Sequence, residues 1–208
     1  HFGSSFQLLV ATLLSAQCTD KRINQITPEL FKHYPDAASM AKAGVEDVFE
    51  YIRTVSYPNA KAKHLVEMAR MLVADFGGEV PDGLQNLMKL PGVGRKTANV
   101  LQAVWFGRAA MAVDTHVYRV SHRMGLVPKT ANTPLKVEEY LMKHIPQSDI
   151  PDAHHWLLLH GRLIGLRTVS RDACPHDARL VERQLGIVAD LLPVAPAVTQ
   201  HAQQRVIV

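Results

Sequence analysis

The chain has 208 residues, of which 47% are hydrophobic and 20% are charged, enough for one or two globular domains with real cores. No apolar run is long enough to span a bilayer and no signal peptide is evident, so we expect no membrane partner. The formal charge of +4 and the pI near 9.1 suit a polyanionic partner, although many unrelated proteins are equally basic.

Apolar residues recur at helical spacing along most of the chain, and no strand pattern is evident. In the first half, helices are predicted over residues 6–14, 23–31, 45–55 and 62–76. Turns or caps between them are predicted at Pro35-Asp36, Gly44, Pro58-Asn59 and Pro81-Asp82. In the second half, helices are predicted over residues 114–124, 134–145 and 152–166. The predicted fold class is therefore all-α.

Between these halves, residues 90–99 read LPGVGRKTAN. A short helix is predicted over residues 84–89, which Pro91 ends, and a second helix begins near Arg95. Gly92 and Gly94 allow the sharp turn between them. The free N–H groups at the start of the second helix suit a phosphate oxygen, and only small residues let a phosphate approach the backbone so closely. The pattern predicts a turn that binds the phosphate backbone of a nucleic acid without sequence-specific contacts to the bases.

Two residues near this turn are candidates for chemistry. Lys96 lies in the first turn of the second helix, where the helix dipole opposes a positive charge, so its amine is a candidate nucleophile. On position alone, a solvated surface lysine is the commoner role. Asp114 follows an apolar run and is predicted to cap the next helix. A cap can also be a catalytic carboxylate, because a helix N-terminus favours negative charge.

Three segments, LPGVGRKTANV, AVDTHVYRVSHR and HHWLLLHGR, resemble those of endonuclease III, a bacterial DNA glycosylase and abasic-site lyase of the helix-hairpin-helix superfamily. The similarity includes residues 6–9 and 13–20 and runs from about His1 to Arg162. It implies two helical lobes with a DNA-binding cleft between them, and the family has a further short helix before the position of His1. A helix-barrel lobe is expected over residues 1–108, with the hairpin at about 84–104. A second lobe is expected over 109–190, followed by a weakly ordered tail over 191–208.

The resemblance also implies a mechanism. Lys96 falls on the lysine that attacks the sugar C1′ of a damaged pyrimidine nucleotide, expels the base and leaves a Schiff base, after which the 3′ phosphate is eliminated. Asp114 falls on the aspartate that stabilises positive charge on the sugar and assists proton transfer. The lysine favours this bifunctional reaction, since relatives that remove adenine opposite oxidised guanine usually lack it. We expect a monomer that acts on duplex DNA in the bacterial cytoplasm, at the nucleoid.

Several DNA contacts are implied in the same way. Gln17 falls on a wedge residue that fills the gap left by a flipped nucleotide. A second wedge is expected in the loop over residues 55–59, where the family often has an apolar side chain and this chain has Tyr57. His116 matches a histidine near the family's active site, although on its own a structural role is commoner. Hairpin contacts are expected from Gly92, Val93, Gly94, Arg95 and Thr97.

The family usually holds a [4Fe-4S] cluster through four cysteines, whereas this chain has two, Cys18 and Cys174. The ungapped register places Gly165, Asp172, Pro175 and Val181 at the ligand positions, so we expect no cluster. Two explanations stay open: a natural relative without a cluster, or an altered reading frame or engineered terminus after Arg162. Under the second explanation the protein is expected to be unstable or to bind DNA weakly, because the family uses the cluster loop for phosphate contacts, part of which Arg162, Arg167 and Arg171 can retain.

The remaining alternatives are weaker. His154, His155 and His160 do not place three ligands on one helix face, and Cys174 with His176 lacks partners, so no metal ligands are expected. The family implies an alkali cation held by carbonyl groups of the hairpin. A P-loop is disfavoured because Arg95, not glycine, precedes the lysine and no strand leads in. A monofunctional glycosylase and a non-catalytic hairpin protein, weakened by loss of the cluster, stay open.

Overall fold

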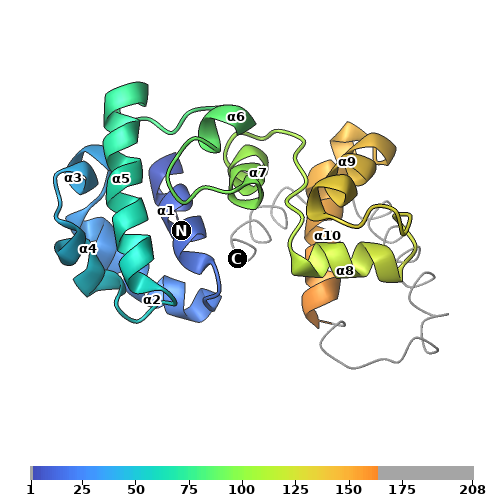
Figure 1. Cartoon of the computed structure of the whole chain (residues 1–208), viewed down its shortest axis with the longest axis horizontal. Helices are drawn as coiled ribbons and strands as arrows, with labels where there is room; N and C mark the ends of the chain where they lie inside the picture. Colours follow the sequence, from blue (N-terminus) through green and yellow to red (C-terminus); the bar gives the residue numbers. More distant parts are fainter. Residues whose placement is uncertain (1, 164–208) are drawn as a thin grey trace, which may run out of the picture. The chain divides into compact units, whose positions relative to one another are not determined.

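The computed structural model describes residues 2–163, which are helical and contain no strand (Figure 1). They form two compact units, the first ending at Arg108 and the second beginning at Ala109. The all-α fold class is confirmed. The cleft between the lobes stays a prediction. The tail over 191–208 and the predictions for Gly165, Arg167, Arg171, Asp172, Cys174, Pro175, His176 and Val181 lie outside the described residues.

The first unit is built around one long helix, α5, which packs against α1, α3 and α4 (Figure 1). Along α5, Ala62, Leu65, Met68, Ala69 and Leu72 are fully buried at helical spacing, and their burial supplies the apolar core of the unit. The helices of this unit are α1 (Ser5–Ser15), α2 (Asp20–His33), α3 (Ala37–Ala41), α4 (Val45–Ile52), α5 (Pro58–Phe76), α6 (Leu84–Leu87) and α7 (Arg95–Val104).

Helix ends account for most differences from the predicted bounds. Helix α2 begins at Asp20, earlier than predicted, because the Thr19 side chain caps it. Helix α5 begins at Pro58, which occupies the first helical turn where a missing N–H costs nothing. Helix α4 ends at Ile52, before the predicted Val55. The short helix α3 was not predicted, since five residues are too few to show a helical period; Asp36 and Ser39 form a capping box at its start.

The second unit has its own core, to which α8, α9 and α10 each contribute buried apolar side chains. Helix α8 (Thr115–Arg123) packs against α10 (Ile150–Leu163), and α9 (Pro134–His144) and the 3-10 helix η1 (Gln147–Asp149) complete the described part. The close approach of α8 and α10 needs Gly161, because a Cβ there would lie 2.7 Å from the Cβ of His116. In the described part of the chain, no helix is both long and apolar enough to cross a bilayer.

Candidate DNA-binding and catalytic residues

The hairpin between α6 and α7 is anchored by apolar side chains and closed by backbone hydrogen bonds. Leu90 and Val93 are 2% and 6% exposed, and the Val93 N–H donates to the Leu90 carbonyl at 3.0 Å. Helix α7 then begins after Gly94, with no side chain capping its first turn. An uncapped helix N-terminus presents N–H donors and the positive end of the helix dipole, which is the chemistry that holds a phosphate.

The two hairpin glycines serve different purposes. Gly92 has a φ of +78°, and a Cβ at this position would lie 3.1 Å from the Cβ and Nδ1 of His64 on α5. A side chain there is therefore strained and crowded at once. Gly94 has a φ of −87°, and an added Cβ would meet nothing within 4 Å. The space beside Gly94 is therefore open, and a side chain there would not strain the fold.

Lys96 is exposed in the first turn of α7, whereas Ala98, Asn99 and Leu101 later in the helix are buried. Its neighbours Arg95 and Thr97 are half-buried. The Lys96 side chain is therefore accessible from solvent. A nucleophile requires this access to reach a substrate carbon.

Asp114 caps α8, as predicted. Its Oδ1 accepts hydrogen bonds from the backbone N–H groups of His116 at 2.9 Å and Val117 at 2.8 Å. The buried residues Met111, Ala112 and Val113 precede it and fix the approach of the chain. His116 is half-buried, and its Nδ1 lies 3.3 Å from a guanidinium nitrogen of Arg119. The two hydrogen bonds of the cap hold the carboxylate in one orientation.

The structure brings the two predicted wedge residues together within the first unit. The hydroxyl of Ser56, which precedes Tyr57, donates a 2.6 Å hydrogen bond to the carbonyl of Gln17. Both side chains are exposed, with Tyr57 at 67%. Lys96 lies in the same unit, whereas Asp114 and His116 lie in the second. Sequence reasoning missed Ser56 and also Lys61, whose ammonium group contacts the end of α1.

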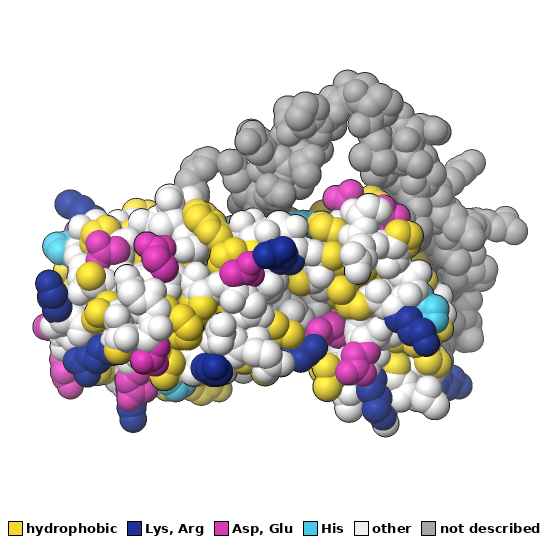
Figure 2. Space-filling view, turned by 90° about the horizontal axis from the view of Figure 1, so that it is seen from above, with side chains coloured by type: hydrophobic (Ala, Val, Ile, Leu, Met, Phe, Trp, Pro, Cys, Tyr) yellow, Lys and Arg dark blue, Asp and Glu magenta, His cyan; other side chains and the backbone are white. Residues whose placement is uncertain are grey.

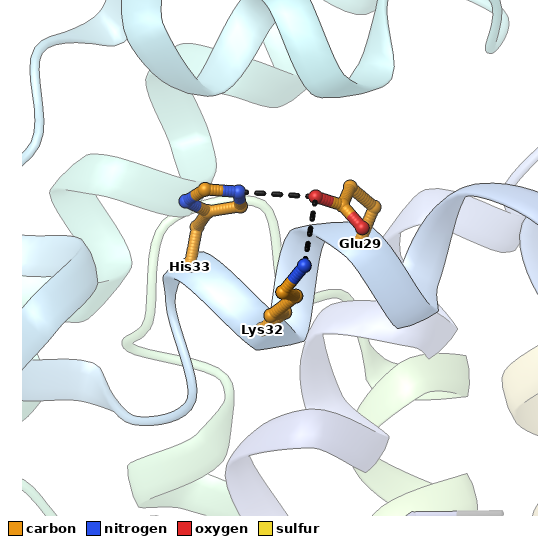
Figure 3. Close-up of polar contacts among 3 residues, drawn as sticks. All are labelled: Glu29, Lys32 and His33. Carbon is orange, nitrogen blue, oxygen red and sulfur yellow. Dashed lines mark hydrogen bonds and ion pairs between the residues drawn. The ribbon is translucent and has the colours of Figure 1, made fainter.

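Figure 2 shows Lys and Arg side chains dispersed among Asp and Glu on the face that it draws. On α2, Glu29 lies 3.1 Å from His33 and 3.8 Å from Lys32 (Figure 3). These three side chains are largely exposed neighbours on one helix, and such pairs add little stability.

Within residues 2–163, no three His, Cys, Asp or Glu side chains lie close enough together to hold a metal ion. The alkali cation at the hairpin stays a prediction.

The hairpin glycines yield a paired prediction. Gly92→Ala should lower the free energy of unfolding by at least about 1–2 kcal/mol, the cost of a left-handed residue that carries a Cβ. Gly94→Ala should stay within about 1 kcal/mol of wild type yet weaken DNA binding, because its Cβ blocks the approach to the backbone. Urea unfolding and fluorescence anisotropy with labelled duplex measure the two effects. Equal destabilisation by both substitutions would contradict this division of roles.

A second prediction concerns the cap of α8. Asp114→Ala should destabilise the protein by about 1 kcal/mol, because two backbone N–H groups lose their acceptor. Asp114→Asn should cost much less, because the amide oxygen can accept the same bonds. Urea unfolding of both variants at neutral pH compares them. An Asn variant as unstable as the Ala variant would show that the charge, rather than the hydrogen bonds, stabilises this helix end.

Comparisons with known proteins agree with this arrangement. Residues 10–147 match the model of the HhH-GPD superfamily of base excision DNA repair proteins. The chain is 44% identical over 162 residues to endonuclease III of Escherichia coli strain K12, covering 78% of this chain and 76% of that protein. It is 42% identical over 175 residues to endonuclease III of Rickettsia felis, covering 84% and 81%.

Solved structures give the same result. That of a trapped endonuclease III–DNA covalent intermediate matches with a TM-score of 0.75 and 41% identity, covering 83% of this chain and 81% of that one. A thermostable thymine-DNA glycosylase, at 22% identity and a TM-score of 0.74, shares the fold. The chain belongs to the endonuclease III family of HhH-GPD base excision DNA repair proteins.

Proposed function

We propose that Lys96 and Asp114 carry the DNA glycosylase and abasic-site lyase reactions that this chain performs as a member of the endonuclease III family. The observation that carries the proposal is the exposed Lys96 amine at the uncapped start of α7, directly after the phosphate-binding turn. A relative with 41% identity has been trapped as a covalent intermediate with DNA, which supports a covalent route.

In this mechanism the neutral Lys96 amine attacks C1′ of the damaged nucleotide and the bond to the base breaks, so that the base leaves with a proton. The C1′–O4′ bond then breaks, O4′ takes up a proton, and the nitrogen lone pair forms the protonated Schiff base of the opened sugar. Loss of a C2′ proton then expels the 3′ phosphate, and water releases the lysine. The Asp114 carboxylate offsets the positive charge that develops on the sugar and accepts a proton from the amine.

The hairpin supports this chemistry by holding the DNA backbone without reading sequence. The sugar carbon is out of reach while the base is stacked, so the nucleotide must leave the helix. Gln17 and Tyr57 would fill the gap, Tyr57 by stacking its ring on neighbouring bases. His116, beside Asp114 on α8, would line the same site. We propose damaged pyrimidines and abasic sites in duplex DNA as the substrates, and a monomer at the bacterial nucleoid in the cytoplasm as the acting form.

The donor set does not fit the family's iron-sulfur cluster. Four thiolates hold such a cluster, and the whole chain has two cysteines, one of which, Cys18, follows α1 in the first unit. We therefore propose a reaction that needs no cluster and assign no step to one. An alkali cation among the carbonyl groups of residues 90–94 would add positive charge where the phosphate binds.

The nucleophile is tested by borohydride trapping on an abasic-site duplex. Wild type should give a covalent protein–DNA adduct, and Lys96→Ala should lose it because no amine is left to form the Schiff base. Lys32→Ala removes an exposed lysine that pairs with Glu29 on α2 and should trap as wild type does. An adduct of wild-type yield from Lys96→Ala would refute the assignment. Base release without any adduct from wild type would indicate a monofunctional glycosylase.

Asp114 is tested by separating turnover from binding. Asp114→Asn should lower single-turnover rates by about 100-fold or more, because the carboxylate acts on charge that exists only in the transition state. The Kd for an uncleavable abasic duplex should change by less than about threefold. Asp36→Asn alters another helix cap, that of α3, and should leave both quantities unchanged. Comparable losses in rate and affinity for Asp114→Asn would contradict a transition-state role.

A further inference from the structure

Gln17 and Tyr57 share an unusual backbone conformation. Within the described residues they are the two non-glycine residues with positive φ, at 57° and 54°. Side-chain-bearing residues resist this left-handed region, and such strain persists only where surrounding contacts impose it. The two strained positions lie 40 residues apart in sequence, but they are held together because Ser56, which precedes Tyr57, donates a hydrogen bond to the carbonyl of Gln17. The contacts that impose the strain are therefore the features to explain.

The backbone and side chain of Lys61 supply three of these contacts. It lies in the first turn of α5, where its own N–H donates to the Tyr57 carbonyl at 3.1 Å. Its ammonium reaches back to the end of α1 and donates to the carbonyls of Leu14 at 2.7 Å and Ala16 at 2.6 Å. The last carbonyls of a helix lack partners within it and attract positive charge, so one lysine satisfies the end of α1 and ties it to α5.

Burial marks Lys61 as different from an ordinary surface lysine. The pKa of its amine is lowered because the group is partly removed from water. A charged group is buried at this cost only where hydrogen bonds compensate it, and here two strong acceptors do so. Ser56 adds the third side-chain bond, to the carbonyl of Gln17. Together, these three side-chain hydrogen bonds fix the backbone over residues 14–17 against the start of α5.

We propose that Lys61 and Ser56 are positioning residues that hold Gln17 and Tyr57, here called the wedge pair, as one preorganised unit for opening the DNA duplex. The inference rests on the proposed function, in which the wedge pair fills the space of the extruded nucleotide. A wedge fixed before binding avoids the entropy cost of ordering two exposed loops on the DNA. In this proposal Lys61 and Ser56 act through the wedge pair, whose loops they hold by hydrogen bonds to backbone carbonyls.

The test uses the lyase reaction on one lesion in two settings, an abasic site in a duplex and the same site in a single strand. Lys61→Met keeps the length of the side chain and removes its charge, while Ser56→Ala removes the third bond at a half-buried position and spares the fold. Both variants should lower the single-turnover rate on the duplex, Lys61→Met by about tenfold or more, as expected for loss of two charged hydrogen bonds. On the single strand both should stay within about twofold of wild type, because nothing must be unstacked.

Matched controls separate positioning from general damage. Lys63→Met removes the neighbouring lysine on α5, which is exposed and pairs with Glu67 at 3.8 Å, and should match wild type on both substrates. Lys61→Arg can still donate to two carbonyls and should restore part of the duplex rate. A 2-aminopurine placed opposite the lesion reports insertion directly, since its fluorescence rises when it is unstacked. Lys61→Met should reduce this rise.

A double-mutant cycle gives the decisive outcome. In a Gln17→Ala/Tyr57→Ala background, adding Lys61→Met should lower the duplex rate by less than about twofold, because the residues on which it acts are gone. Three results would overturn the proposal. One is a full loss of duplex rate on adding Lys61→Met to the Gln17→Ala/Tyr57→Ala background. The others are equal losses of rate by Lys61→Met on duplex and single strand, and a wild-type duplex rate for both Lys61→Met and Ser56→Ala. If instead the proposed function itself were wrong, the wild-type protein would form no borohydride adduct even with the single strand, so the two failures can be told apart.

Discussion

The proposed functional residues of this protein lie at the ends of helices, where backbone groups have no partner within the helix. Four residues assigned to DNA opening or chemistry lie at such ends: Gln17 after α1, Tyr57 before α5, Lys96 at the start of α7 and Asp114 before α8. Each end needs an external partner for its N–H or carbonyl groups. The two apolar cores hold the helices rigidly enough for these ends to keep fixed positions.

The protein satisfies these ends in three different ways. Helix α8 has its partner within the chain, the Asp114 carboxylate, which these two hydrogen bonds orient. The end of α1 is satisfied by the Lys61 ammonium, which ties two loops together across the first unit. Helix α7 has no side-chain cap at Gly94, and we propose that a DNA phosphate binds at its start. One physical requirement therefore accounts for an oriented carboxylate, a fixed pair of loops and the proposed phosphate site.

Local patterns in the sequence predicted much of this. The helical periods, the hairpin and the Asp114 cap could be predicted because each depends on residues close together in the chain. Helix α3 could not, since its five residues are shorter than the pattern needed to detect it. The roles of Ser56 and Lys61 were also missed, because their hydrogen bonds join residues 39 to 47 positions apart and leave no local pattern. The sequence also did not reveal that Gly92 lies against His64, which is distant in the chain. The turn alone was enough to predict that position 92 needs glycine.

We propose that one amine, that of Lys96 at the start of α7, forms the covalent link to DNA. This is tested by reducing the wild-type complex with an abasic duplex, digesting the adduct and identifying the modified peptide by mass spectrometry. We expect the sugar remnant to be attached to Lys96, within the peptide that starts α7. Attachment to another lysine or to the N-terminal amine would contradict it.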